Sequence, residues 1–352
     1  MRSLRLLIPT AIVVALIGMP VSAFHDFGVA DCQGCHTMHN SQDGAPIDAD
    51  GANPWLLIDD NPSDVCLNCH ATRLGAVWAA DPLVPGREIG GGNFTFLDED
   101  NLNDGHDGGL VANWIPGSAA GHNVVAQNWG PGADLTLTMS PGGNFPSSLL
   151  GCTSCHDPHG TDSFRMLYGA GRLVQDTYVF TEAAPTAVGV SIFGGPPESS
   201  TSHTAYQDGM SEWCGNCHAA YHDAYGTLRH PSGTAIQASI ATTYNLYNGT
   251  TDQIGGNAAT SYLAQVPFED PANLTNSEAG PTATSEVSCI TCHRAHASSA
   301  PDSGRWDFAV AFLHEDGVES LAYALPDPYA DLNQRSLCNK CHNQDAFDAN
   351  PF

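Results

Sequence analysis

The cysteines and histidines of this chain follow one repeated pattern that points to a single kind of chemistry. All 12 cysteines form C-x-x-C pairs, and a histidine directly follows every pair. This is the attachment signature of c-type haem, in which two thiols bond the porphyrin and the histidine binds the iron. The sequence therefore predicts six covalently bound haem c groups. The cysteines are Cys32 and Cys35, Cys66 and Cys69, Cys152 and Cys155, Cys214 and Cys217, Cys289 and Cys292, and Cys338 and Cys341; the histidines are His36, His70, His156, His218, His293 and His342.

Two other uses of paired cysteines fit this pattern less well. Zinc ribbons place two C-x-x-C pairs about 15–20 residues apart and need no histidine after each pair. Here the first cysteines of successive pairs are never closer than Cys32 and Cys66, which are 34 residues apart. Disulfides are possible in a secreted chain, but they do not require a histidine after every pair. Haem attachment accounts for all 12 cysteines.

Each haem iron has a second axial position, so six irons need six further ligands. The chain has 16 histidines, and those outside the motifs exceed the number required. Methionine ligation is therefore unnecessary, and Met38, Met139, Met166 and Met210 are expected to serve packing. Three of the remaining histidines, His106, His203 and His314, have polar neighbours and are predicted to lie at the surface. The others are His25, His39, His122, His159, His222, His230 and His296.

Four of these histidines stand at helical spacing from a motif. His39, His159 and His296 each lie three residues beyond a motif histidine, and His222 lies four beyond His218. On a helical turn such a pair shares one face, so both members cannot bind one iron from opposite sides. Each would instead bind the iron of a different haem, or else remain at the surface. His122 and His230 occur in turn-like surroundings that could hold an imidazole rigidly.

The elements that must position these groups are expected to be short. With 36 glycines and 23 prolines, the chain is predicted to be a mostly irregular multihaem cytochrome c with short helices and few short strands, in which the haem stack forms the core. Short helices should follow the motifs, limited in two cases by Pro158 and Pro231. Brief strands are expected around Leu135–Met139 and Leu173–Phe180. The haem sites group by sequence within 24–75, 145–233 and 286–345, and we expect one domain over 24–352.

Residues 1–23 read as a secretory signal peptide. Arg2 and Arg5 precede an apolar run, and Val21–Ala23 forms a small-residue cleavage site. An uncleaved membrane anchor is the alternative, but the apolar run is short and Pro20 interrupts it. No later segment has the length and apolarity of a membrane span. We therefore expect export to the periplasm or beyond.

The formal net charge of −27 excludes two classes of partner. Nucleic acids and anionic lipids are polyanions, and both would be repelled by the chain. An acidic run at 98–107 could bind calcium, but its glycine does not stand where an EF-hand loop requires it. A solvated acidic loop is favoured over a calcium site there.

Several stretches resemble the OmcS-type hexahaem cytochromes, which are extracellular bacterial proteins that polymerise into conductive filaments. They are FHDFGVADCQGCHTMHNS (24–41), GHNVVA (121–126), LTLTMSPGGNFPSSLLGCTSCHDPHG (135–160), GMSEWCGNCH (209–218), LRHPSG (228–233), CITCHRAHAS (289–298) and QRSLCNKCH (334–342). The regions 72–118, 165–205 and 235–285 match poorly. The resemblance implies six bis-histidine haems in a continuous stack.

The resemblance also implies the second ligands and the mode of assembly. Seven histidines match family positions, although only six are needed: His25, His39, His122, His159, His222, His230 and His296. The surplus one is either His25 or His222. His39 would bind the haem that a neighbouring subunit carries at Cys289, Cys292 and His293. Because donor and acceptor surfaces then differ, identical subunits would add head to tail into an open filament.

The function expected from these features is electron transfer without a substrate site. Electrons would arrive from periplasmic or outer-membrane cytochromes and leave to an extracellular acceptor, such as a metal oxide, an electrode or a partner cell. A multihaem reductase is the alternative, but that class needs a haem with an exchangeable ligand, often marked by an altered motif. A soluble periplasmic electron shuttle with the same haems is a third possibility.

Overall fold

The computed structural model describes residues 25, 32–71, 77–79, 90–97, 102–103, 114–115, 119–190, 198–222, 232–248, 255–313, 316 and 334–343. Over these residues the chain is mostly irregular, with short helices and two-stranded ladders, as the glycine and proline content predicted. None of the helices in these ranges has the length and apolarity to cross a membrane. The signal peptide expected at 1–23 and the acidic run at 98–107 lie almost wholly outside the described residues.

Each of the six haem-attachment motifs overlaps one short helix, and the other helices of the described residues lie between motifs. The α-helices are α1 (Pro62–His70), α2 (Met210–His222), α3 (Ala238–Leu246) and α4 (Cys289–Cys292). The 3-10 helices are η1 (Cys32–Gly34), η2 (Pro54–Leu56), η3 (Phe94–Leu97), η6 (Gln127–Trp129), η7 (Ser147–Leu149), η8 (Cys152–Ser154), η9 (Phe164–Met166), η10 (Pro301–Ser303) and η12 (Leu337–Lys340). Helices were expected to follow the motifs, but they contain them, because the motif cysteines themselves form the helical turn.

The strands pair only as short antiparallel ladders. They are β1 (Ser41–Gln42) with β2 (Ala45–Pro46), β3 (Leu102–Asn103) with β4 (Trp114–Ile115), β5 (Leu173–Val174) with β6 (Tyr178–Val179), β7 (Thr186–Val188) with β8 (Ala205–Asp208), and β9 (Thr234–Ala235) with β10 (Glu286–Val287). The β5–β6 hairpin confirms the strand prediction at Leu173–Phe180. The prediction at Leu135–Met139 is wrong: this segment lies exposed and forms only an isolated bridge from Met139 to Pro146.

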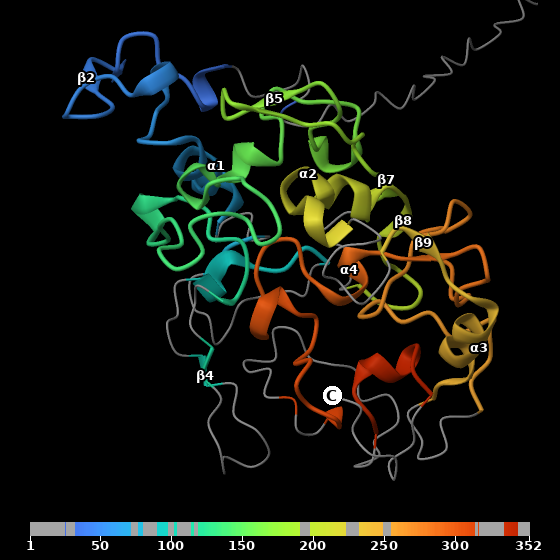
Figure 1. The fold of residues 1–352 in the computed structure, drawn as a ribbon. Coiled ribbons are helices and arrows are strands. Elements are labelled where there is room, and N and C mark those ends of the chain that lie inside the picture. The colour runs from blue at the N-terminus through green and yellow to red at the C-terminus, as the bar shows by residue number, and fades with distance from the viewer. Residues whose placement is uncertain are drawn as a thin grey trace, which may run out of the picture.

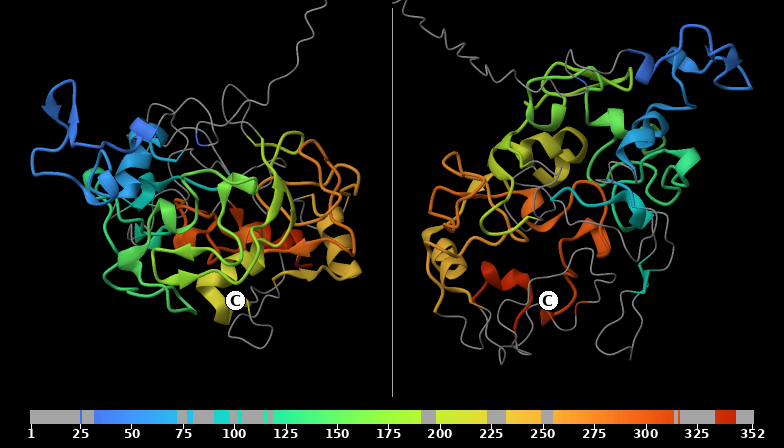
Figure 2. Two further views of the ribbon diagram at one scale, coloured as in Figure 1. Left: turned by 90° about the horizontal axis from the view of Figure 1, so that it is seen from above. Right: turned by 180° about the vertical axis from the view of Figure 1, so that it is seen from behind.

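The elements that carry the motifs are arranged from one end of the molecule toward the other. Figure 1 shows β2 at the top, α1 and α2 below it, α4 in the centre and the red η12 near the bottom, whereas segments between motifs run back, with β5 near the top and β4 near the bottom. The view from behind in Figure 2 likewise has the blue elements at the top and the red η12 near the bottom. The elements that carry motifs therefore follow one another in space as they do in sequence.

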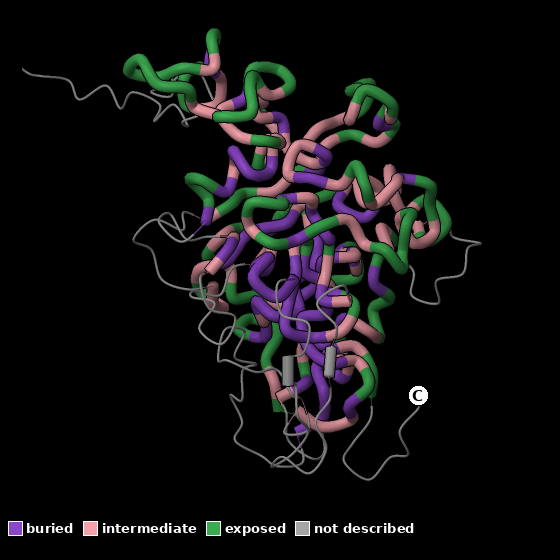
Figure 3. Tube along the Cα trace, turned by 90° about the vertical axis from the view of Figure 1, so that its left-hand side faces the viewer, coloured by how far each residue is buried: buried purple, intermediate pink, exposed green. Residues whose placement is uncertain are grey.

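The buried apolar side chains of the described residues form separate clusters instead of one core. One cluster surrounds Phe96, a second contains Tyr244 and Trp306, and smaller ones surround Phe180 and Met210. Motif cysteines pack against these clusters, Cys292 on the second among them. Figure 3 shows the buried residues running along the centre of the molecule with exposed segments around them. Such a divided core fits a chain whose largest apolar groups are cofactors.

Candidate haem-binding sites

Four motif histidines are held by the same kind of hydrogen bond. In each, the imidazole Nδ1 lies against a backbone carbonyl oxygen, which accepts its proton. The oxygens and distances are Trp55 O at 2.9 Å from His36, Arg165 O at 2.8 Å from His156, Pro141 O at 2.7 Å from His218, and Asp302 O at 2.9 Å from His293. A proton on Nδ1 leaves the lone pair of Nε2 free, which is the tautomer that an iron ligand requires.

The first, third and fifth motifs share one local structure that provides this carbonyl. After each motif the chain returns through a tight turn whose two central residues have positive φ, near 55°, which is the type I′ conformation. Its first central residue accepts the proton of the imidazole. The turns are centred on Trp55–Leu56, Arg165–Met166 and Asp302–Ser303. Isolated bridges then join His36 to Leu57, His156 to Leu167 and His293 to Gly304.

The second and fourth motifs lie within regular helices. Asn61 caps α1, with its side-chain oxygen accepting hydrogen bonds from the amides of Ser63 and Asp64. The helix ends at His70, whereas α2 continues past His218 to His222 with non-helical φ/ψ at His218 itself.

Four pairs of imidazoles face one another across a gap of uniform width. The ring centres of His25 and His70 are 6.0 Å apart, and those of His36 and His159 are 6.4 Å apart. His122 and His218 are separated by 5.9 Å, and His156 and His296 by 6.4 Å.

This width matches one metal ion between two imidazoles. Metal–nitrogen bonds of about 2.0 Å, with each ring centre about 1.2 Å behind its nitrogen, separate two axial rings by about 6.4 Å. The second member of most pairs is also oriented by a carbonyl: Nδ1 of His25 lies 3.1 Å from Pro158 O, and that of His122 lies 2.7 Å from Ala295 O. For His296 the partner is Gly92 O at 3.4 Å. The residues present therefore fit a haem at each of these positions.

Burial lowers the pKa of several of these imidazoles, which favours the neutral form that a metal ligand needs. It lowers the pKa of His122 to about 4 and that of His296 to about 3, with smaller contributions from neighbouring histidines. Burial likewise lowers the pKa of His156 and of His218. A neutral imidazole presents a lone pair at physiological pH.

Several predicted ligands are not paired in this way. His39 is exposed in the loop before β1. The ring beside His293 is that of Phe308, 5.4 Å away and edge-on, and no imidazole of the described residues faces it. Nε2 of His222 lies 3.8 Å from Glu212 Oε1. His230 lies outside the described residues.

The six motifs form one line in chain order. Burial raises the pKa of Cys35, and the thiol of Cys69 raises it further. Burial also raises the pKa of Cys155 and of Cys292 to about 12, with added contributions from Cys217 and from Cys338 respectively. Hydrogen bonds join Cys66 to Cys152 and Cys214 to Cys289. Thiols of consecutive motifs are thus neighbours from the first motif to the sixth.

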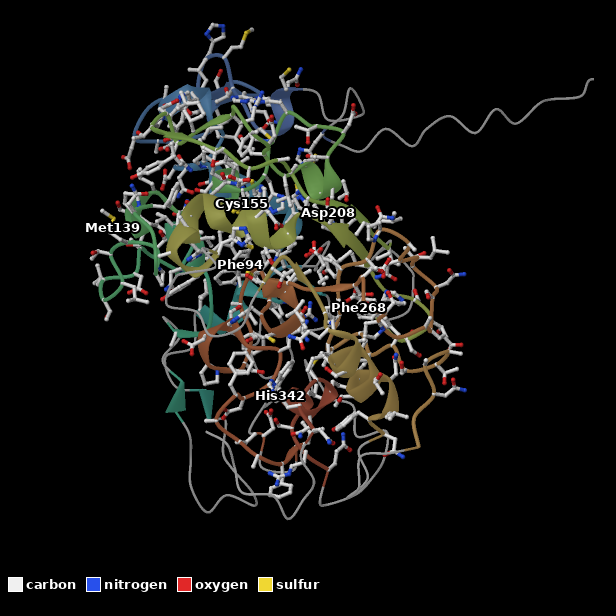
Figure 4. The ribbon with its side chains drawn as sticks, turned by 45° about the vertical axis from the view of Figure 1, so that its right-hand side comes forward. Phe94, Met139, Cys155, Asp208, Phe268 and His342 are labelled. Carbon is white, nitrogen blue, oxygen red and sulfur yellow. The ribbon has the colours of Figure 1, made fainter. Side chains whose placement is uncertain are left out.

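This line differs from the grouping expected from sequence distance. The two thiol hydrogen bonds join the second motif to the third and the fourth to the fifth, across the long intervening segments. The contacts of α1 with η8 and of α2 with α4 make these junctions. In Figure 4 Cys155 of the third motif lies in the upper part of the molecule and His342 of the sixth in the lower part.

Three further expectations are corrected by the structure. His39, His159 and His296 do not lie on helical turns, because the chain is extended or bent after these motifs; only His222 follows its motif in a helix. His203, expected at the surface, is 1% exposed, with both ring nitrogens near carbonyl oxygens and its ring stacked on Tyr262. Met38 and Met139 are exposed instead of packed within the subunit.

No cluster of histidine, cysteine and carboxylate side chains suited to a free metal ion occurs in the described part of the chain. Sequence reasoning also missed the carbonyl acceptors at Trp55, Arg165 and Asp302. The turns at Trp55 and Arg165 use residues other than glycine, asparagine or aspartate, so no residue type signalled them, whereas Asp302 and Ser303 are common turn residues.

Comparison with known proteins identifies clear relatives. No protein-family model matches the chain. The C-type cytochrome OmcS of Geobacter sulfurreducens is 32% identical over 98% of this chain and 100% of that protein. A cryo-EM structure of OmcS nanowires from the same organism has a TM-score of 0.78 at 32% identity, covering 92% of this chain and all of that one. A structure of its outer membrane cytochrome S filament has a TM-score of 0.76 at 30% identity, with the same coverage.

Proposed function

Because this chain belongs to the OmcS family of c-type cytochromes, we propose that it transfers electrons outside the cell as a filament of identical multihaem subunits. The number of haem c groups is six, one for each C-x-x-C-H motif. Each bound haem supplies a one-electron couple at its iron. The polypeptide attaches these groups in a line, orients the axial imidazoles through carbonyl hydrogen bonds, and surrounds the sites with apolar side chains.

The observation that carries the filament proposal is the pattern of imidazole pairs. His159, just beyond the third motif, faces His36 of the first, and His296, just beyond the fifth, faces His156 of the third. The third and fifth motifs thus each supply the second ligand for the preceding odd-numbered motif. In its own chain the first motif, followed by His39, has no odd-numbered motif before it, and the fifth, with His293, has none after it. Binding of His39 to the haem at His293 of a neighbouring subunit continues the series.

The remaining ligand assignments follow from the same pairs. His25, His122, His159 and His296 serve the second, fourth, first and third sites. The sixth site, at His342, is left with His222 or His230. Because His25 faces His70, the surplus histidine is one of these last two and not His25.

Further parts of the proposal concern export and partners. Residues 1–23 are removed as a secretory signal, and residues 24–352 cross the periplasm and form one domain. Cytochromes of the periplasm or outer membrane deliver electrons, and an extracellular oxidant accepts them. The protein has no substrate site of its own, because each iron is held by two histidines in the polymer.

Substitution of His39 tests this function. We expect His39→Ala to remain monomeric in sedimentation and to show no filaments by electron microscopy, whereas Gln42→Ala, in the exposed strand β1 just beyond that loop, assembles normally. The monomer should also bind cyanide at one haem, since the fifth site then lacks its second histidine. Filaments of His39→Ala with an unchanged haem spectrum would overturn the proposal.

A further inference from the structure

The structure contains one arrangement three times, beginning at the first, third and fifth motifs. We define the attachment loops as residues 32–39, 152–159 and 289–296, each with the sequence C-x-x-C-H-x-x-H. In each loop the motif histidine bridges to a residue just after a type I′ turn. The amide after that histidine also donates to the second central carbonyl of the turn, as from Thr37 to Leu56, Asp157 to Met166 and Arg294 to Ser303.

The second and third loops each contact two haem sites of the preceding part of the chain. The final histidine of the loop faces the preceding odd-numbered motif, as His159 faces His36. The residue just before that histidine offers its carbonyl oxygen to the imidazole that serves the even-numbered site. Pro158 O takes the Nδ1 proton of His25, which faces His70, and Ala295 O takes that of His122, which faces His218.

Only the backbone is common to these two contacts. The residues that offer the carbonyl are proline in one loop and alanine in the other, so no side chain specifies the hydrogen bond. Each donor histidine serves an even-numbered site and precedes, in sequence, the attachment loop of the odd-numbered site just before it. His25 precedes Cys32, and His122 precedes Cys152. Their distances to the carbonyl oxygens, 3.1 and 2.7 Å, are those of true hydrogen bonds.

The first loop presents the same groups to solvent. Met38, which corresponds to Pro158 and Ala295, is 80% exposed, and His39 is exposed, as Ala295 and His159 also are; the loops differ in their first three residues. Cys32, Gln33 and Gly34 of η1 are exposed as well, whereas the corresponding residues 152–154 and 289–291 are half-buried or buried. The first loop thus offers the same contact groups as the second and third loops, and its first residues are exposed where the corresponding residues of those loops are covered.

We propose that the first loop of one copy of the chain seats on the last two haem sites of a second copy, with the carbonyl oxygen of Met38 accepting the Nδ1 proton of the imidazole opposite His342. The inference rests on the proposed function, since His39 must reach the haem at His293 for Met38 to be placed there. The donor is His222 or His230, which precede Cys289 as His25 precedes Cys32. A hydrogen bond of this kind orients an axial imidazole and raises its basicity.

One hydrogen bond that the second and third loops make within the chain has no counterpart in the proposed contact between copies. Ser63 Oγ accepts a hydrogen bond from the amide of Cys152 at 3.1 Å, and Ser211 Oγ accepts one from Cys289 at 3.2 Å. Both serines stand three residues before a motif cysteine, and the corresponding residue before Cys338 is Arg335. The junction between copies therefore shares the histidine and carbonyl contacts but not the serine.

Photochemical cross-linking within filaments tests this placement. A benzophenone amino acid is introduced at position 38, and filaments are assembled from a mixture of ¹⁵N-labelled and unlabelled chains, so that mixed-isotope peptides report contacts between copies. We expect cross-links to peptides with His222 or His230, or with residues 334–343. The control places the same group at Leu173, which is 56% exposed on β5, and should not label these peptides.

The outcomes separate this inference from the function on which it rests. Filaments in which position 38 labels other parts of the second copy would overturn the placement and leave the filament standing. Failure of the unsubstituted chain to polymerise would overturn both.

Discussion

Hydrogen bonds to backbone carbonyls decide which nitrogen of each histidine is available. A histidine that is free to rotate offers either nitrogen, whereas one whose Nδ1 proton is held by a carbonyl offers only Nε2. The acceptors belong to turns and loops that are far from the histidine in sequence, such as Ala295 for His122. Ligand geometry at one site therefore depends on the chain around another site, and disturbance of one site should spread to its neighbour.

A buried carboxyl gives the protein a specific dependence on pH. Glu269 is 1% exposed; its Oε1 accepts a hydrogen bond from the amide of Met210, and no donor of the described residues reaches Oε2. Burial, together with the nearby carboxylates of Glu212, Asp208 and Glu286, raises its pKa from 4.5 to about 7. Between these pH values the folded protein holds a proton that the unfolded chain has lost, so stability falls as the pH rises.

We predict that Glu269→Gln removes this dependence. The variant should match the unsubstituted protein near pH 4.5 and exceed its free energy of unfolding by about 3 kcal/mol above pH 7. Denaturation followed by circular dichroism across this range measures the difference. Glu278→Gln, at an exposed carboxyl, is the control and should leave the slope unchanged. Parallel curves for Glu269→Gln and the unsubstituted protein would contradict the prediction.

At the scale of elements, two backbone segments that pass close together hold His122 and His296, which face motif histidines of different haem sites. Gly121 forms a bridge with Ala297, and the amide of His122 donates to the carbonyl of His296 at 2.8 Å. A Cβ atom on Gly121 would lie 2.2 Å from His296 O and 2.5 Å from the Cα of Ala297. Only glycine permits this approach.

Gly121→Ala should therefore separate two histidines that serve different sites. We expect a loss of about 1–3 kcal/mol in the free energy of unfolding, typical of overpacking, together with a changed haem absorption spectrum. Gly132→Ala is the matched control, because a Cβ there meets nothing within 4 Å. An unaltered spectrum and stability in Gly121→Ala would show that the two segments can move apart freely.

Arg305 joins three segments that are distant in sequence. Its guanidinium donates to the carbonyls of Ile290 at 2.7 Å, Ala264 at 3.3 Å and Gly90 at 3.2 Å, and the residue is 1% exposed. Hydrogen bonds from charged donors contribute about 1.5–3 kcal/mol each, and their loss leaves buried carbonyls unsatisfied. Arg305 thus links α4, which contains Ile290, to the irregular segments that contain Ala264 and Gly90.

Arg305→Met is predicted to cost at least about 3 kcal/mol in chemical denaturation. Arg165→Met, which removes one bond of 3.3 Å from an exposed guanidinium, should cost less than about 1 kcal/mol. Equal losses in the two variants would argue against the three-carbonyl tie.

The sequence predicts the chemistry of this protein better than its geometry. The C-x-x-C-H motifs identify the cofactor because covalent attachment demands fixed residue types at fixed spacing. His159 and His296 face motif histidines other than those of their own motifs, although the helical turn expected after those motifs does not form. The type I′ turns at Trp55 and Arg165 could not be predicted, since tertiary contacts and not residue type impose their positive φ.

For the whole molecule, the negative charge opposes association. The chain carries −27 at neutral pH, and identical subunits that approach one another repel unless ions screen them. In the proposed filament, the histidine–iron bond at each junction would overcome this repulsion.

Filament assembly should accordingly quicken with salt. We expect light scattering to rise faster at about 0.5 M than at about 0.01 M NaCl, where the screening length is about 30 Å. Mild acidification toward the isoelectric point, near pH 4.5, should act in the same direction. Faster assembly at low ionic strength would mean that attraction between opposite charges directs the contact.

The threefold repetition of the attachment loops also has a mechanical consequence. In the proposed filament, two of every three junctions lie inside one polypeptide, where peptide bonds run alongside the histidine contacts. At the third junction no covalent backbone crosses. A stretched or diluted filament will therefore part only there, and its fragments will always contain whole subunits, each with an exposed histidine at one end and a haem short of a ligand at the other.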